Sequence, residues 1–337
     1  DQMEKARSID DTEERLDSML SITKYHLFNL PDSGRVAGKF LIEEAIKVGH
    51  QEYLGLAYHY VGVADAWQGK YDQALALYDQ SLSIFKEIGA EHRLSIVYNS
   101  IGGVYYDQNN YAQAMEYWQK SRIQAIKSKN DRRIEVSNNN LAVLYKSIGE
   151  LDKAKSLFYQ NLDLAVNNHW KESKGFAYVN LCKIFIAEGN LDSAQDLGYK
   201  SYTIFEVTGN TRGAADVLKN LSEIEFLKGK TKEGFALARK SLAQWEIIGD
   251  QLNIGVLHHF LGTQFLDRNA IDSAISHSLV AHENGKMADG LGVLQKSCEC
   301  LAAAYHKKGA FEKAYEFQQQ LTMINDSIFN RRCVRIL

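Results

Sequence analysis

Residues 69–74 read Gly69-Lys70-Tyr71-Asp72-Gln73-Ala74, and a phrase of the same kind returns every 40 residues along the chain. Each copy has a small or polar turn pair, then a bulky residue, two spacers and a small residue. The other copies are Asn109 to Ala114, Gly149 to Ala154, Gly189 to Ala194, Gly229 to Gly234, Asn269 to Ala274 and Gly309 to Ala314. In a degenerate copy one period earlier, Gly34 takes the small position. A period in this range is typical of a solenoid of helical hairpins.

A second small residue lies twelve positions before the small residue that ends most copies. These positions hold Gly62, Gly102, Ala142, Cys182, Ser222, Gly262 and Ala302. Two helix backbones approach closely only where both lack bulk. We therefore expect the first helix (A) and the second helix (B) of each hairpin to cross at these positions.

Glycines also mark the helix ends with the same 40-residue period. After the second helix of several repeats the chain places Gly49, Gly89, Gly209 and Gly249, and glycine is the residue least strained in a left-handed closing conformation. A single proline in 337 residues leaves the helices unbroken. We predict an all-α chain of about eight hairpins between Asp10 and Phe329, as one solenoid domain over residues 1–330 with a C-terminal tail at 331–337.

The repeat resembles the tetratricopeptide repeat in a lengthened form. The stretch Asn138-Asn139-Asn140-Leu141-Ala142-Val143-Leu144-Tyr145, followed by residues 149–154, is similar to repeats of kinesin light chains. The resemblance covers almost the whole chain and implies a right-handed α-α superhelix. Because this architecture hosts many unrelated tasks, it implies a fold more than a function.

Composition excludes several classes of function. The net charge is −3, from 39 basic and 42 acidic residues, so no field strong enough to attract nucleic acid is expected. No run of 18 apolar residues occurs, so we expect no insertion of this segment into a membrane. The four cysteines show no disulfide framework. A protein or a peptide is the expected partner, and the oligomeric state stays open.

No motif for catalysis is found. The chain lacks a glycine-rich phosphate loop, a nucleophile elbow and a zinc helix. His258, His259, His277 and His282 are expected to be surface or packing histidines rather than metal ligands. The charged run from Lys127 to Arg133 is expected to be a solvated turn between hairpins. We predict no catalytic residue, no metal and no cofactor, so this segment is not expected to be an enzyme.

Asparagines recur on the A helices, which line the concave wall if the tetratricopeptide register holds. One column has Asn140, Asn180 and Asn220 at 40-residue steps, and the column before it has Asn99 and Asn139. An amide both donates and accepts, so it can pair with the backbone of an extended peptide. In kinesin light chains such a ladder holds peptides, and the resemblance implies the same role here. Alternatively, these amides bond neighbouring carbonyls and steady the stack.

A second mode of tetratricopeptide recognition is not matched. Domains that clamp the carboxylate end of chaperones resemble one another in a Lys followed four residues later by Asn on helix A. The pairs at these positions are His59 and Val63, Asn99 and Gly103, Asn139 and Val143, and Lys219 and Glu223. We therefore do not expect a chaperone-tail adaptor.

The C-terminal stretch Leu321 to Asn330 resembles the closing helix of sensor regions in bacterial membrane-bound signalling proteins. That resemblance implies the sensory input region of a signal-transduction protein, on the periplasmic side of a membrane, with a kinase or cyclase output domain outside this segment. The ending 331–337 lacks the coiled coil expected there. The alternative is a free cytoplasmic peptide-sensing regulator or adaptor. Both alternatives predict a scaffold that binds a partner in its concave groove.

Overall fold

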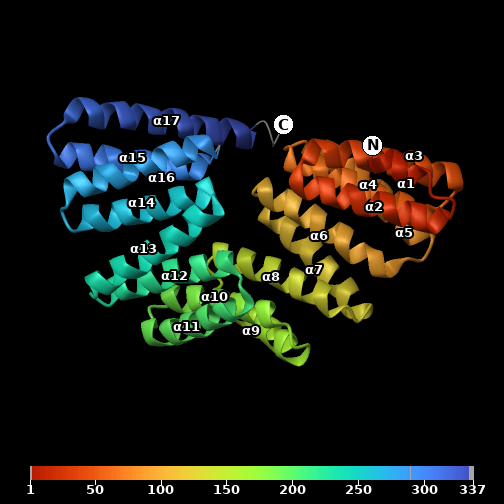
Figure 1. Ribbon diagram of the computed structural model, residues 1–337, viewed down its shortest axis with the longest axis horizontal. Coiled ribbons are helices and arrows are strands. Elements are labelled where there is room, and N and C mark those ends of the chain that lie inside the picture. Colours follow the sequence, from red (N-terminus) through yellow and green to blue (C-terminus); the bar gives the residue numbers. More distant parts are fainter. Residues whose placement is uncertain (1, 289, 334–337) are drawn as a thin grey trace. The chain divides into compact units, whose positions relative to one another are not determined.

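The computed structural model describes residues 2–288 and 290–333, and within these residues the regular structure is entirely helical (Figure 1). Seventeen helices follow one another: α1 (Gln2–Arg7), α2 (Thr12–Asn29), α3 (Pro31–Val48), α4 (Gln51–Trp67), α5 (Tyr71–Glu87), α6 (Glu91–Asp107), α7 (Tyr111–Lys127), α8 (Asp131–Ser147), α9 (Leu151–Asn167), α10 (Lys171–Ala187), α11 (Leu191–Thr208), α12 (Thr211–Leu227), α13 (Thr231–Ile248), α14 (Gln251–Asp267), α15 (Ile271–Met287), α16 (Leu291–Lys307) and α17 (Phe311–Cys333). The all-α prediction is confirmed.

Helices α2 to α17 follow one another in the order that eight hairpins predict, with the even-numbered helices as A helices and the odd-numbered ones as B helices. Contacts pair α2 with α3, α4 with α5, α6 with α7, α10 with α11, α12 with α13, α14 with α15 and α16 with α17. The short helix α1, which precedes them, was not predicted. Contacts divide the chain within α9 into two compact units, the first ending at Leu157 and the second beginning at Phe158. The single domain over residues 1–330 stays a prediction. Helix α17 continues to Cys333, and residues 334–337 of the predicted tail lie outside the described residues.

The turns within the hairpins fall where the repeated phrase predicts them. A positive φ occurs at Gly69, Asn109, Gly149, Gly189, Gly229, Asn269 and Gly309. In the first of these turns the Lys70 N–H donates to the Asp65 carbonyl over 2.9 Å, and the other six turns repeat this bond. Such a bond satisfies a carbonyl that the helix end would otherwise leave unpaired. The repeated phrase therefore encodes one turn geometry, whose left-handed residue is most easily glycine or asparagine.

The helices of a hairpin cross at the two small-residue columns. Ala74, Ala114, Ala154 and Ala194 have no exposed surface, as the sequence predicts. On the facing A helix, a Cβ added to Gly102 would lie 2.5 Å from Cδ1 of Trp118. The indole therefore occupies the space that a larger residue at position 102 would need.

Buried serines add a second connection between the paired helices, which the sequence analysis did not predict. In each case a serine on the B helix donates its hydroxyl to a main-chain carbonyl of the A helix 26 positions earlier. The bonds are Ser81 to Gly55 at 2.7 Å, Ser121 to Ser95 at 2.8 Å, Ser201 to Gly175 at 2.9 Å and Ser241 to Ala215 at 2.7 Å. Each bond satisfies a hydroxyl that would otherwise be buried without a partner.

Successive A helices also touch each other within each unit. In the first unit α2 contacts α4, α4 contacts α6 and α6 contacts α8, while in the second unit α10 contacts α12 and α14 contacts α16. Where consecutive A helices touch, polar groups can interact from one repeat to the next. None of the described helices is long and apolar enough to cross a bilayer.

The crossing predicts opposite effects at two neighbouring glycines. Gly102→Ala should lower the free energy of unfolding by about 1–3 kcal/mol because its methyl group overlaps the Trp118 ring. Gly103→Ala should raise it by about 0.5–1 kcal/mol, since alanine is the better helix former and no heavy atom lies within 4 Å of the added Cβ. Urea denaturation measures both. Equal stability of the two variants would mean that the helices do not cross at Gly102.

Candidate functional site

The five asparagines singled out by sequence all lie on A helices. Asn99 is on α6, and Asn139 and Asn140 are on α8, in the first unit; Asn180 is on α10 and Asn220 on α12, in the second. A common channel for all five stays a prediction. Within each unit, the surroundings of the amides can be described separately.

In the first unit the structure brings two of these amides together. Asn140 donates from Nδ2 to Oδ1 of Asn99 over 2.8 Å, and both side chains are partly buried. The two residues are 41 positions apart, so the amides pair diagonally between the two predicted columns rather than along one of them. His59 and Ser100 form a second bond with this offset, at 2.9 Å. Because one mutual bond uses only part of an amide's capacity, a donor and an acceptor remain for a ligand.

In the second unit Asn220 is buried deeply, with 2% of its surface exposed. Its Nδ2 atom is buried without a hydrogen-bond partner in the part of the chain that the structure describes. Asn180, on the preceding A helix, is partly buried. Leaving a buried donor unpaired is unfavourable by about 1–3 kcal/mol.

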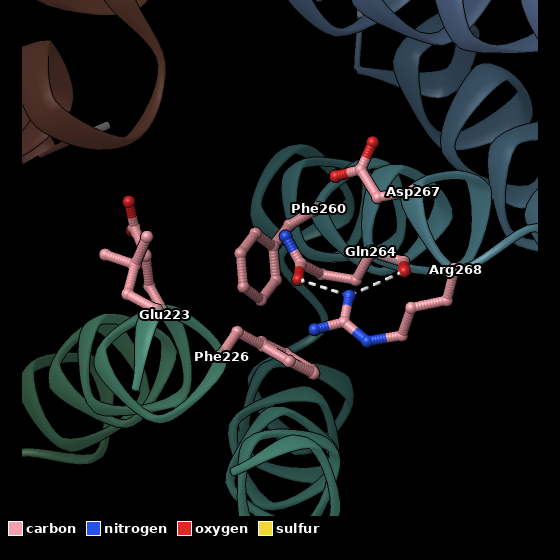
Figure 2. Close-up of a pocket in the computed structure, with 7 residues that line it drawn as sticks. Glu223, Phe226, Phe260, Gln264, Asp267 and Arg268 are labelled. Carbon is pink, nitrogen blue, oxygen red and sulfur yellow. Dashed lines mark hydrogen bonds between the residues drawn. The ribbon is translucent and has the colours of Figure 1, made fainter. Parts of the chain in front are cut away.

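A cavity of about 550 Å³ opens on the A-helix face of the second unit, between α12 and α14. It is lined by Glu223, Phe226, Leu227, Phe260, Gln264, Asp267 and Arg268. The rings of Phe226 and Phe260 lie 5.8 Å apart at its centre, with Glu223 and Arg268 on opposite sides (Figure 2). Apolar walls with a few polar groups at the edge are typical of a ligand pocket.

The charged groups at this cavity are held in place. Arg268 donates from Nη1 to the main-chain oxygen of Gln264 over 2.8 Å and to its Oε1 over 3.0 Å, as Figure 2 shows. Its guanidinium carbon lies 4.7 Å from the centre of the Phe226 ring, a favourable cation–π distance. Glu223 is paired with Lys219 at 3.1 Å. The cavity therefore suits an apolar ligand side chain that is flanked by polar groups of the same ligand.

The four histidines form no metal site. His258 and His277 face each other with their Nδ1 atoms 3.0 Å apart, so one ring donates to the other. His282 instead bonds Ser297 at 3.2 Å. Over residues 2–288 and 290–333, no group of three or more histidines, cysteines and carboxylates is arranged to hold a metal ion.

Burial lowers the pKa of all four of these rings. The pKa of His258 falls to about 4 through burial and the nearby His277, and that of His259 falls to about 4 through burial and the charge of Lys296. Both rings are therefore neutral near pH 7. They serve as packing groups that resist protonation.

Residues 53–122 and 301–327 match family models described as tetratricopeptide repeat. The chain carries tetratricopeptide repeats. No curated protein sequence matches it.

Three solved structures share this fold. The apo form of RapI has 13% identity and a TM-score of 0.66, covering 82% of this chain and 99% of its own. The Rap conjugation gene regulator of the plasmid pLS20, solved with the Phr* peptide, has 15% identity and a TM-score of 0.62, covering 97% and 93%. The apo quorum sensor NprR from B. thuringiensis has 15% identity and a TM-score of 0.65, covering 95% and 90%. At such identities the likeness shows the fold alone.

Sequence reasoning missed the cavity between α12 and α14. Phe260 continues the column of Asn140, Asn180 and Asn220 one repeat further, and Phe226 lies on the same helix as Asn220. The available signal was weak: Arg268 directly follows α14, where it can reach back across the turn to Phe226 of the preceding repeat.

The lowered histidine pKa values predict acid sensitivity. Between about pH 6.5 and pH 4 the unfolded chain binds protons that His258 and His259 refuse in the folded state, so stability falls as pH falls through this window. Each such histidine contributes a slope of up to about 1.4 kcal/mol per pH unit. His258→Gln should give a shallower fall of the urea-derived stability between pH 6.5 and 4.5. An unchanged slope would show that the ring of His258 is protonated in the folded state.

Proposed function

We propose that this chain is a peptide-binding regulatory scaffold that performs no chemistry of its own. The observation that carries the proposal is the cavity between α12 and α14, because it combines an apolar floor with fixed charges on the face shared by the A helices. An extended peptide placed along this face would lay an apolar side chain against Phe226 and Phe260. Its backbone would pair with asparagine amides, which accept and donate whatever the peptide's side chains are.

The amides are suited to this task in different ways in the two units. Asn99 and Asn140 already bond each other and keep capacity for a ligand. Asn220 has a buried amide nitrogen without an acceptor in the described structure. A carbonyl from a peptide would supply the acceptor. Asn139 on α8 and Asn180 on α10 add a further amide to the first and the second unit, respectively. Each unit therefore has its own proposed site, which is Asn99, Asn139 and Asn140 in the first unit and Asn180, Asn220 and the cavity in the second.

Of the two settings that the sequence suggests, a free regulator is the one we favour. Its support is the fold shared with the Rap regulator solved with a peptide and with the quorum sensor NprR. No comparable support exists for a periplasmic, membrane-anchored sensor. A peptide would act by favouring one pitch of the stacked hairpins over another, since each hairpin contacts only its neighbours and small rotations add along the array.

The proposal is tested by selecting ligands and then removing the amides. Random heptapeptides displayed on phage are selected on the purified chain, and the best binder is synthesised with a fluorescent label. Asn99→Ala/Asn140→Ala and Asn180→Ala/Asn220→Ala should each weaken its binding by about 5- to 150-fold. This corresponds to two hydrogen bonds of about 0.5–1.5 kcal/mol each. Fluorescence polarisation gives the dissociation constants.

A matched control is Asn284→Ala, because Asn284 lies on the B helix α15 and its amide bonds the carbonyl of Val280 in the same helix. This variant should bind the peptide as tightly as the unaltered chain. The thermal midpoints of the double variants should stay close to that of the parent. If selection enriches no peptide, or if binding is lost only in proportion to unfolding, the scaffold does not bind peptides through these amides.

A further inference from the structure

A group of cations converges on one tyrosine in the first unit. Lys24 of α2 places its Nζ atom 5.4 Å from the centre of the Tyr60 ring, which belongs to α4. Arg93 on α6 and Arg133 on α8 occupy the same position of two successive repeats, 40 residues apart. All four side chains are partly buried, and the helices that carry them are consecutive A helices that contact one another.

The charges in this group are unequally compensated. Arg93 is paired with Glu52, with Nη2 and Nε at 2.7 and 2.8 Å from Oε1. Arg133 has no carboxylate partner within residues 2–288 and 290–333, and neither does the ammonium group of Lys24 form an ion pair there. Asp17, the carboxylate that acts on Lys24, accepts a hydrogen bond from the Tyr53 hydroxyl. The group therefore holds more positive than negative charge.

The pKa values of these residues reflect their closeness. Burial lowers the pKa of Lys24, and the positive charges of Arg93 and Arg133 lower it further. Burial also lowers the pKa of Arg133, with Tyr60 acting to raise it and Arg93 to lower it. Cations brought together out of water without a counter-charge destabilise the folded chain. A bound anion would remove that penalty.

Arg133 belongs to the charged run that the sequence assigned to a solvated turn. The structure separates the members of that run. Lys127 lies at the end of α7 and is exposed, and Arg132 is exposed and paired with Glu135 at 3.3 Å. Arg133 is partly buried and is unpaired within the described residues, and it lies on α8, which contacts the helix α6 that carries Arg93.

We propose that Lys24, Arg93 and Arg133, with the hydroxyl of Tyr60, form a seat for a carboxylate group, so that the peptide accepted by the first unit is acidic. A guanidinium group presents parallel N–H donors that match the two oxygens of a carboxylate, while an ammonium group adds a point charge. None of these residues occupies the helix positions of the chaperone clamp. The inference rests on the proposed function, and it names the class of peptide that the scaffold would accept.

The test uses fluorescein-labelled tetra-aspartate and, as its neutral isostere, tetra-asparagine amide. Tetra-aspartate should bind at least tenfold more tightly than tetra-asparagine amide at low salt, and the difference should shrink as salt is added. Arg133→Gln should lower the affinity for tetra-aspartate about tenfold, and Arg133→Lys should restore part of it. The adjacent, outward-facing Arg132→Gln is the matched control and should leave the affinity unchanged.

Two further measurements separate the possible results. Tetra-aspartate amide, compared with the free acid, shows whether a side-chain or a C-terminal carboxylate occupies the seat. The thermal midpoint of Arg133→Gln should stay level or rise, because an unpaired cation is removed. A clear fall of that midpoint would identify Arg133 as structural and overturn the proposal, as would equal binding of the two tetrapeptides or equal losses in Arg132→Gln and Arg133→Gln.

Failure of this proposal and failure of the proposed function give different patterns. If phage-selected neutral peptides bind the parent chain and Arg133→Gln equally while tetra-aspartate does not bind, the scaffold function stands and the carboxylate seat is wrong. If inorganic phosphate displaces tetra-aspartate from the parent chain but selection enriches no peptide, the anion seat stands and the peptide scaffold is wrong.

Discussion

The close approach of two helices within each hairpin is the constraint on which the rest of this structure depends. It exists because alanine or glycine occupies both sides of the crossing, as at Ala114 and Gly102, where the Trp118 ring fills the remaining space. Close packing of this kind gives many weak dispersion contacts between the two helices. A larger side chain at the crossing would push the helices apart and lose these contacts. Each hairpin then presents a defined A-helix face, and the stacking of hairpins joins these faces together.

The interior of the stack and its A-helix face treat polar groups differently. Inside a hairpin, a buried hydroxyl such as that of Ser201 donates a short hydrogen bond to a main-chain carbonyl of the partner helix. On the A-helix face, Asn220 keeps an unpaired amide nitrogen and Arg133 an uncompensated charge in the described structure. Polar groups with hydrogen-bond partners stabilise the array, whereas a polar group without a partner can be stabilised by a ligand that supplies one.

The two parts of the proposed site complement each other chemically. The cavity of the second unit offers aromatic surface between Phe226 and Phe260, with Arg268 held against one ring. The first unit offers positive charge around Tyr60 and an amide pair at Asn99 and Asn140. An apolar side chain of a peptide would suit the second unit and a carboxylate the first, and in each unit the amides would bind the peptide backbone. Selectivity would then come from a few side chains on a backbone-binding frame.

The sequence by itself determined the hairpins, their number, their turns and their crossings. These features depend on local rules: a left-handed residue such as Gly69 or Asn109 closes a helix, and a small residue such as Ala74 admits a neighbour. The sequence also placed five asparagines on the A helices. It could not decide their surroundings, because the burial of Asn220 and the diagonal pairing of Asn140 depend on how far each repeat is rotated against the next.

Only the tertiary structure decided which charges meet. Arg132 and Arg133 are neighbours of the same type in one charged run, and nothing in their local sequence distinguishes them. Helix geometry turns consecutive side chains about 100° apart, so one pairs with Glu135 on the surface and the other approaches Tyr60 and Lys24 from distant repeats. Charged side chains of different repeats come together because small rotations between packed hairpins add along the stack. No single repeat encodes it.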